Sequence, residues 1–342
     1  MTISLTLTGD LQKKPLDKEF SILLVEEPEA HLHPQLLDLL FNFFKKSDSQ
    51  SKIQIIMTSH SPSLVAKTDI DSLHIMHDVD ELTKITSLKQ IKFNNVEGKN
   101  KEQKDDLKRY LDVTKSQLFF AKRVVFVEGI SEALLLSEFA KVLGKPFDKY
   151  AVEIVNINGV AFEPFAKLFT NNNNKTNIQF PCAIISDNDK CTNADDQYKI
   201  KADEIVYSTA DFVALSEKIK QGSVSYRAKI LSEFGRDNIC VELAEKTMEY
   251  ELGLIKENND ILLEILSTEH PSMQKDIKKQ IGSGDSQEII AMRFWVAIKD
   301  CKGTFAQKLA AQISQIFTKE RNDVTFVVPQ YIQRAINHII PD

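Results

Sequence analysis

The chain has 342 residues, which suggests about two domains of ordinary size. Hydrophobic residues make up 42% and charged residues 27%, a composition that excludes global disorder. No apolar run reaches about 18 residues, so we expect no transmembrane helix and no membrane partner. The N-terminus lacks the pattern of a secretory signal, and the cysteines lack CxxC spacing. Both observations favour a reducing compartment, the cytoplasm, over a disulfide framework or a zinc site.

The net charge of −6 argues against a protein that coats nucleic acid without specificity. It is compatible with a nucleic-acid enzyme, because an acidic metal site contributes negative charge while basic patches lie elsewhere. The net charge is therefore compatible with an enzyme that acts on nucleic acid.

The first part of the chain alternates between strand and helix patterns. Residues 20–25 and 52–57 are short apolar runs, as expected for strands buried on both faces of a parallel sheet. Between them, Pro34 opens a helical pattern, and residues 73–76 predict a third strand. This order predicts an α/β fold, in which ligands bind at the carboxyl ends of the strands.

A basic segment follows at residues 84–123. It contains 11 Lys or Arg residues against 5 Asp or Glu residues, a local net charge of +6. Two interpretations remain open: a solvated connector, or a surface that contacts the phosphate backbone of a nucleic acid.

The second part of the chain, from Arg123 onwards, again alternates strands and helices. Residues 211–300 have mainly helical patterns. The remaining predicted strands are 124–127, 152–157, 181–185 and 205–207, and the remaining predicted helices are 132–143, 162–169, 304–317 and 331–340.

Four carboxylates stand at the ends of predicted strands. Glu128 follows one strand and Glu132 lies one helical turn later, while Asp187 and Asp189 follow another strand. Each pair alone is also compatible with a helix-dipole contact or a simple turn. Together they predict a site for Mg²⁺ or Mn²⁺, since clustered carboxylates repel each other unless cations neutralise them. Two such ions about 4 Å apart are suited to phosphoryl transfer.

The segments VVFVEGISE (124–132) and AIISDND (183–189) resemble a Toprim domain. Three further segments resemble the OLD (overcoming lysogenization defect) nucleases, including the nuclease subunit of Gabija-type phage-defence systems. They are FFAKRVVFVEG (119–129), KTMEYELG (246–253) and CKGTFAQKLA (301–310). The resemblance implies that Glu249 joins the metal shell and that Lys302 is catalytic. A lysine there would stabilise the transition state of phosphodiester cleavage.

The segment ILLVEEP (22–28) resembles a Walker B motif of an ABC-type ATPase. The resemblance implies that Glu26 holds Mg²⁺ and that Glu27 polarises the hydrolytic water. TSHSP (58–62) resembles the switch segment, with His60 sensing the γ-phosphate. However, the chain contains no GxxxxGK[ST] loop. We therefore expect a vestigial ATP site that uses ATP only if the missing N-terminal part is supplied.

The predicted organisation is an ATPase part at 1–82, a basic connector at 83–121 and a Toprim nuclease domain at 122–342 with a helical insertion at about 211–300. The predicted function is a metal-dependent DNA endonuclease or nickase with two Mg²⁺ or Mn²⁺ ions, in phage defence or DNA repair. Expected partners are DNA, further copies of the chain and, for a Gabija-type protein, a helicase-like protein. Two alternatives remain: a non-catalytic DNA-binding or dimerisation module, and an SMC/RecF-like repair ATPase remnant.

Overall fold

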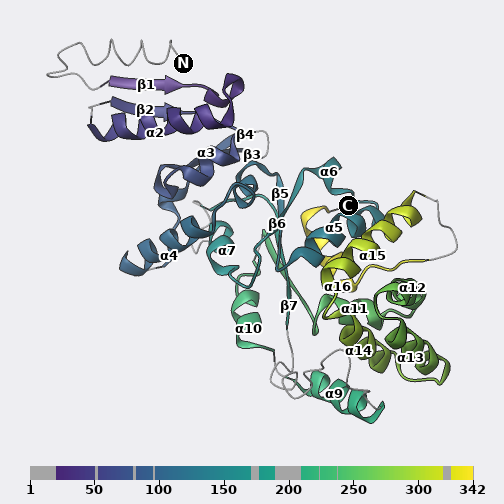
Figure 1. Ribbon diagram of the computed structural model, residues 1–342. Coiled ribbons are helices and arrows are strands. Elements are labelled where there is room, and N and C mark those ends of the chain that lie inside the picture. Colours follow the sequence, from purple (N-terminus) through teal and green to yellow (C-terminus); the bar gives the residue numbers. More distant parts are fainter. Residues whose placement is uncertain are drawn as a thin grey trace. The chain divides into compact units, whose positions relative to one another are not determined.

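The computed structural model describes residues 21–50, 53–79, 82–94, 97–170, 177–188, 209–222, 224–236, 238–318 and 325–341. The chain divides into two compact units, Met1–Thr68 and Asp69–Asp342. Figure 1 labels the helices and strands of both units. None of the described helices combines the length and apolar character needed to cross a membrane.

The first unit contains the predicted strand, helix and strand. Strand β1 (Ser21–Val25) pairs in parallel with β2 (Ile53–Met57), and the helix α2 (Pro34–Gln50) lies between them in the chain. The short helices η1 (Pro28–His31) and α3 (Pro62–Lys67) complete it. Apolar side chains of this two-stranded sheet are exposed on one face; Leu24, for example, is 72% exposed.

The second unit begins with a hairpin that corrects one expectation. The predicted strand at 73–76 exists as β3 (His74–Val79), but it pairs antiparallel with β4 (Leu82–Ser87) and does not extend the first sheet. The short helices η2 (Ile70–Ser72) and η3 (Leu88–Gln90) flank the hairpin.

The basic segment is built into the second unit and is not a solvated connector. It forms α4 (Glu97–Tyr110) and η4 (Lys115–Phe120), and α4 packs against α7 (Glu163–Phe169). Fully buried apolar side chains hold it there: Leu88, Ile91, Leu107 and Leu118. Most of the Lys and Arg side chains of this segment lie on the outer surface.

A four-stranded parallel sheet forms the centre of the second unit, in the order β6-β5-β7-β8. The strands are β5 (Arg123–Val127), β6 (Val152–Asn156), β7 (Cys182–Asp187) and β8 (Ile239–Ala244). Because helices cover the sheet, β7 is buried along its whole length, as its unbroken apolar run predicted. The predicted α/β class with a parallel sheet is therefore confirmed.

The strand β8 lies where the sequence pattern predicted mainly helices. It is an edge strand whose middle residues are only half buried, so its sequence, ICVELA, is not a continuous apolar run. The predicted strand at 205–207 lies outside the described residues.

Helices pack on both faces of this sheet. Phe126 of β5 points to one face, where its ring lies 5.6 Å from Phe165 and 5.9 Å from Phe169 of α7. Its neighbours Val125 and Val127 point to the other face and join the main core. There α5 (Ile130–Val142) packs against α15 (Lys302–Phe317), and α16 (Gln330–Ile339) packs against β7 and β8.

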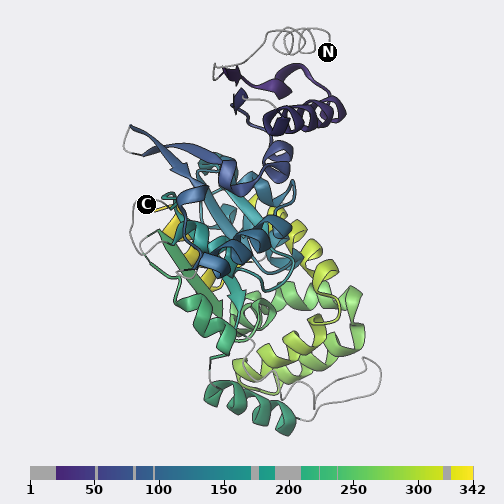
Figure 2. The same cartoon turned by 90° about the vertical axis from the view of Figure 1, so that its left-hand side faces the viewer.

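Most of the remaining helices lie at about 211–300, where the helical insertion was predicted, although β8 interrupts them. Helices α11 to α14 pack against one another as one group, which Figures 1 and 2 show beside the sheet. Their bounds and those of the other helices are α6 (Phe147–Tyr150), α9 (Thr209–Gln221), α10 (Tyr226–Ser232), α11 (Met248–Leu254), η5 (Lys256–Asn258), α12 (Asn259–Glu269), α13 (Pro271–Gly282) and α14 (Gln287–Ile298).

Candidate active site at the carboxyl edge of the sheet

Two neighbouring strands end in carboxylates at the same edge of the sheet. Glu128 directly follows β5, and Asp187 is the last residue of β7. The strands are parallel and in register, with Val127 opposite Ile185, so both acids emerge at one edge. Gly129 then begins α5, whose first turn contains Glu132. A Cβ atom at Gly129 would lie 3.2 Å from Glu132 Oε2, so glycine leaves this carboxylate room.

Glu249 and Lys302 join this edge from two helices. Glu249 lies in the first turn of α11, which Thr247 caps by accepting a hydrogen bond from the Tyr250 amide. Its side chain is 2% exposed, and its Oε2 atom lies 3.1 Å from Lys302 Nζ. That contact is an ion pair. Among the described residues, neither Glu249 oxygen accepts a hydrogen bond.

The pKa values show that these groups share one electrostatic environment. Burial raises the pKa of Asp187 well above its ordinary value, and the charge of Glu249 adds to the effect. Burial likewise raises the pKa of Glu132, with smaller contributions from Glu249 and Glu128. Burial lowers the pKa of Lys302, but Glu249 and Asp187 outweigh it, so the pKa ends above its ordinary value. The lysine is therefore charged at neutral pH.

The donor chemistry of this edge fits a hard divalent cation. All candidate ligands are carboxylate oxygens, and Glu249 has two buried oxygens that no described residue satisfies by a hydrogen bond. Within the described residues, no three His, Cys, Asp or Glu side chains already converge on one point. Cationic side chains contact two of the acids instead, because Lys302 pairs with Glu249 and Arg227 with Glu128. The predicted ligand Asp189 lies outside the described residues.

Three side chains at this edge were not predicted from the sequence. Arg227 of α10 donates to Glu128 Oε2 at 3.2 Å and to the Asp187 carbonyl oxygen at 2.8 Å. Ser186 Oγ donates to the same Glu128 oxygen at 2.9 Å. Tyr331 of α16 is buried, and its hydroxyl has no hydrogen-bond partner among the described residues. Burial raises the pKa of Tyr331 well above its ordinary value, and Asp187 and Glu132 raise it further, so the hydroxyl stays protonated.

Ser186 could have been found, because it lies within the AIISDND segment. Arg227 offers no such signal, since it is a single arginine in a short helix without a motif. Tyr331 looks like any apolar position of an amphipathic helix.

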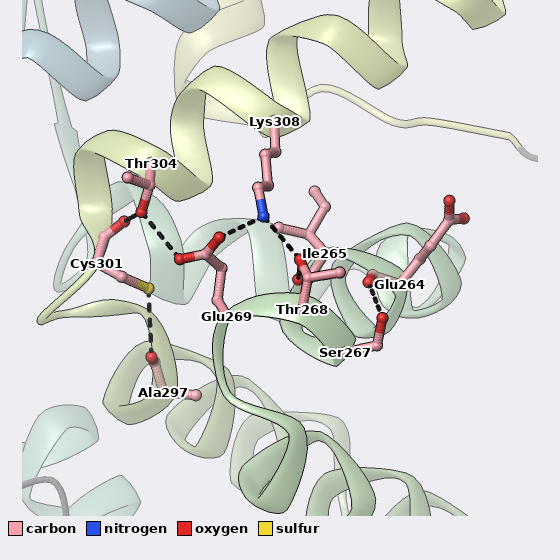
Figure 3. Close-up of polar contacts among 9 residues, drawn as sticks. All are labelled: Glu264, Ile265, Ser267, Thr268, Glu269, Ala297, Cys301, Thr304 and Lys308. Carbon is pink, nitrogen blue, oxygen red and sulfur yellow. Dashed lines mark hydrogen bonds and ion pairs between the residues drawn. The ribbon is translucent and has the colours of Figure 1, made fainter.

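Polar contacts fix the first turns of α15, which begins with Lys302 (Figure 3). Thr304 Oγ1 donates to Glu269 Oε2 at 3.1 Å, and Lys308 contacts the other oxygen of Glu269 in an ion pair. Lys308 Nζ also donates to Thr268 Oγ1 at 2.7 Å. These contacts tie the start of α15, the helix that carries Lys302, to the end of α12.

The ATPase-like residues lie in the first unit and form a separate, more exposed cluster. Glu26 and Glu27 directly follow β1, and Glu27 has a left-handed backbone, with φ of 43°. Its amide donates to the Thr58 carbonyl oxygen at 3.2 Å, which joins the two strand ends. Glu27 Oε1 lies 3.1 Å from Nε2 of His60. The structure therefore brings together Glu27 and His60, two of the three predicted ATP-site residues.

Comparison with known proteins supports both halves of this description. Residues 119–189 match the family model of the overcoming lysogenization defect protein-like TOPRIM domain. Residues 3–66 match an AAA domain whose description names the AbiEii toxin of a type IV toxin–antitoxin system.

Among similar proteins, Endonuclease GajA of Bacillus cereus (strain HuB5-5) is 23% identical over 371 residues, covering 98% of this chain and 51% of that protein. The OLD nuclease of Thermus scotoductus is 23% identical over 152 residues, covering 43% of this chain and 28% of that protein. A solved C-terminal region of the Xanthomonas campestris OLD protein aligns with a TM-score of 0.40 at 23% identity, covering 65% of this chain and 94% of that one. The chain spans about half the length of the first of these relatives.

Proposed function

We propose that this chain, which carries an OLD-like Toprim domain beside an AAA-type segment and is homologous to the OLD-family nucleases, is a metal-dependent DNA endonuclease or nickase. The carboxyl edge of the second unit is its active site. The substrate is the phosphodiester backbone of DNA, and the reaction is hydrolysis.

In this proposal Glu128, Glu132, Asp187, Asp189 and Glu249 hold two Mg²⁺ or Mn²⁺ ions. When bound, the ions would activate a water molecule and stabilise the negative charge that develops on the phosphate. Lys302 has a different task. Its ammonium group is charged and 38% exposed, so it can reach a phosphate while Glu249 orients it. There it stabilises the extra charge of the transition state.

The observation that carries the proposal is the Glu249–Lys302 pair. A carboxylate this deeply buried costs free energy, because a single ion pair with Lys302 does not fully repay its desolvation. A lone structural ion pair could be replaced by apolar packing at no loss of stability. The arrangement is explained if these oxygens serve a cation, as the nearby Asp187 and Glu132 also would.

The retained acids and Lys302 also favour hydrolysis over the alternative of a non-catalytic DNA-binding or dimerisation module. An SMC/RecF-like remnant would account for the first unit but leaves the carboxyl edge of the second unit unexplained. We further propose that the chain alone does not bind ATP, because it has no phosphate-cradling GxxxxGK[ST] loop. Coupling to ATP, assembly into homo-oligomers, a helicase-like partner and a role in phage defence or repair belong to the same proposal.

The test is conversion of supercoiled plasmid to nicked and linear forms, titrated with Mg²⁺ and Mn²⁺. Glu128→Ala and Asp187→Asn should abolish cleavage, while Glu233→Gln, an exposed acid after α10, should cleave like wild type. Full cleavage by either site variant would refute the proposed site. For the nucleotide claim, calorimetry with ATP should show no binding, and micromolar affinity would refute it.

A further inference from the structure

Arg227 connects two parts of the carboxyl edge that are far apart in the sequence. One arm of its guanidinium group donates to Glu128 Oε2 at 3.2 Å, and the other donates to the Asp187 carbonyl oxygen at 2.8 Å. The side chain is three-quarters buried, like that of Glu128. The fork therefore spans the ends of β5 and β7, the two strands that present the acids.

The helix that carries Arg227 is itself attached to the same place. The Ser225 amide, at the start of α10, donates to Asn188 Oδ1 at 3.2 Å, and Asn188 follows Asp187 directly. Helix α10 also packs against β8, the neighbour of β7 in the sheet. Arg227 thus reaches Glu128 from a helix with two further attachments, which limits the freedom of the guanidinium group.

The donors at Glu128 converge on one of its two oxygens. Ser186 Oγ donates to Oε2 at 2.9 Å, and Arg227 donates to the same atom. No donor among the described residues contacts Oε1. Two hydrogen bonds to one oxygen restrict the rotation of the carboxylate and leave its other oxygen available to an incoming ligand.

We propose that Arg227 is a positioning residue for the metal site: with Ser186, it holds Glu128 through Oε2 so that Oε1 is presented to the cation. This inference rests on the proposed function, because it presupposes a metal at the carboxyl edge. A guanidinium group suits the task better than an ammonium group, since its planar fork can contact the carboxylate and the Asp187 carbonyl together.

A competing role predicts the opposite result. If Arg227 were only a substitute cation for Glu128, its removal would relieve competition, and divalent ions would bind more tightly. If it positions the carboxylate, its removal frees Glu128 to rotate, and binding weakens. Loss of a residue that orients a ligand typically costs about 10–100-fold in metal affinity.

The experiment measures Mn²⁺ affinity of the full chain without DNA, from the electron paramagnetic resonance signal of free Mn²⁺. Arg227→Ala should weaken binding about tenfold, and Arg227→Lys should weaken it severalfold, because lysine keeps the charge but cannot contact both acceptors. Ser186→Ala should also weaken binding. Lys229→Ala, an exposed residue of the same helix, is the matched control and should bind like wild type.

The outcomes separate this inference from the proposed function. Wild type that binds no Mn²⁺ would refute the metal site itself. If the wild type binds Mn²⁺ and Arg227→Ala binds it equally or more tightly, only the positioning role is refuted. If Arg227→Lys bound Mn²⁺ with wild-type affinity, a positive charge alone would be sufficient. That result would refute the requirement for a guanidinium group that contacts both acceptors. Circular dichroism of each variant confirms that it is folded.

Discussion

Both units end a parallel strand in an acid and pair an acid with a basic side chain, yet the two settings differ. In the first unit, Glu27 contacts His60, whose side chain is 81% exposed. In the second unit, Glu249 is 2% exposed and contacts Lys302. The cause lies in the sheets: two strands with an open face leave the first pair in water, while four covered strands bury the second. An acid–base pair is therefore solvated in one unit and buried in the other.

The largest expected effect tests the difference in burial directly. Phe126→Ala removes a fully buried ring of β5 that contacts Phe165 and Phe169. It should lower the free energy of unfolding by about 3–5 kcal/mol, because a cavity remains. Leu24→Ala, on the open face of the first unit, should change it by less than about 0.5 kcal/mol. Chemical denaturation measures both, and equal losses would contradict the contrast between the units.

The second prediction compares two lysine–acid pairs of similar lysine exposure. Lys302 is 38% exposed and pairs with the buried Glu249, whereas Lys67 is 43% exposed and pairs with the exposed Asp38. Lys302→Met should slow plasmid cleavage by about 10²–10³-fold, the usual loss for one group that stabilises transition-state charge. Lys67→Met should leave the rate unchanged. A similar loss in both variants would show that the effect is not specific to the carboxyl edge.

The third prediction concerns the packing that places Glu249. A Cβ atom on Gly253, one turn later in α11, would lie 2.9 Å from Ala291 Cα of α14. Gly253→Ala should therefore cost about 1–3 kcal/mol, because backbone must shift. Gly98→Ala in α4, where nothing lies within 4 Å, should be neutral or stabilise by up to about 1 kcal/mol. Thermal unfolding distinguishes them, and a neutral Gly253→Ala would refute tight packing of α11 on α14.

The smallest effect is expected at the exposed contacts around α15. The hydrogen bond from Lys308 lowers the pKa of Glu269, so this contact stabilises the fold above the ordinary pKa of a glutamate and is lost as the pH falls through the lowered value. Lys308→Ala should cost less than about 1 kcal/mol at pH 7, as for other exposed pairs. The melting temperatures of variant and wild type should converge in the acid range. A difference that persists there would point to a role of Lys308 other than this ion pair.

The sequence predicted those parts of the fold that are buried on both sides. The strands β5 and β7 were found because each contains a continuous apolar run, Val124–Val127 and Cys182–Ile185, and the acids at their ends mark the candidate site. The edge strand β8 was missed because half-buried positions tolerate residues such as Glu242, which pairs with Arg334. The basic segment was misread because its buried leucines are widely spaced among charged residues.

The site required different information from the fold. Glu249 and Lys302 were proposed by resemblance to a family, since a helical glutamate and a lysine before a helix are ordinary by themselves. Arg227 could not be found from the sequence, because the role proposed for it depends on the three-dimensional placement of α10 at the carboxyl edge of the sheet. Long-range polar contacts of this kind leave no periodic pattern in a sequence.

One long-range hydrogen bond in the second unit has a consequence for the order in which the protein folds during synthesis. Arg123, at the start of β5, donates to the carbonyl oxygen of Ile339 at 2.7 Å, 216 residues further along the chain. At typical rates of synthesis, about 5–20 residues per second, these residues emerge roughly 10 to 40 s apart. The strand that ends at Glu128 thus leaves the ribosome long before the helix that secures its other end. The hydrogen bond can therefore form only after the last described helix has emerged, and a prematurely terminated product would lack it.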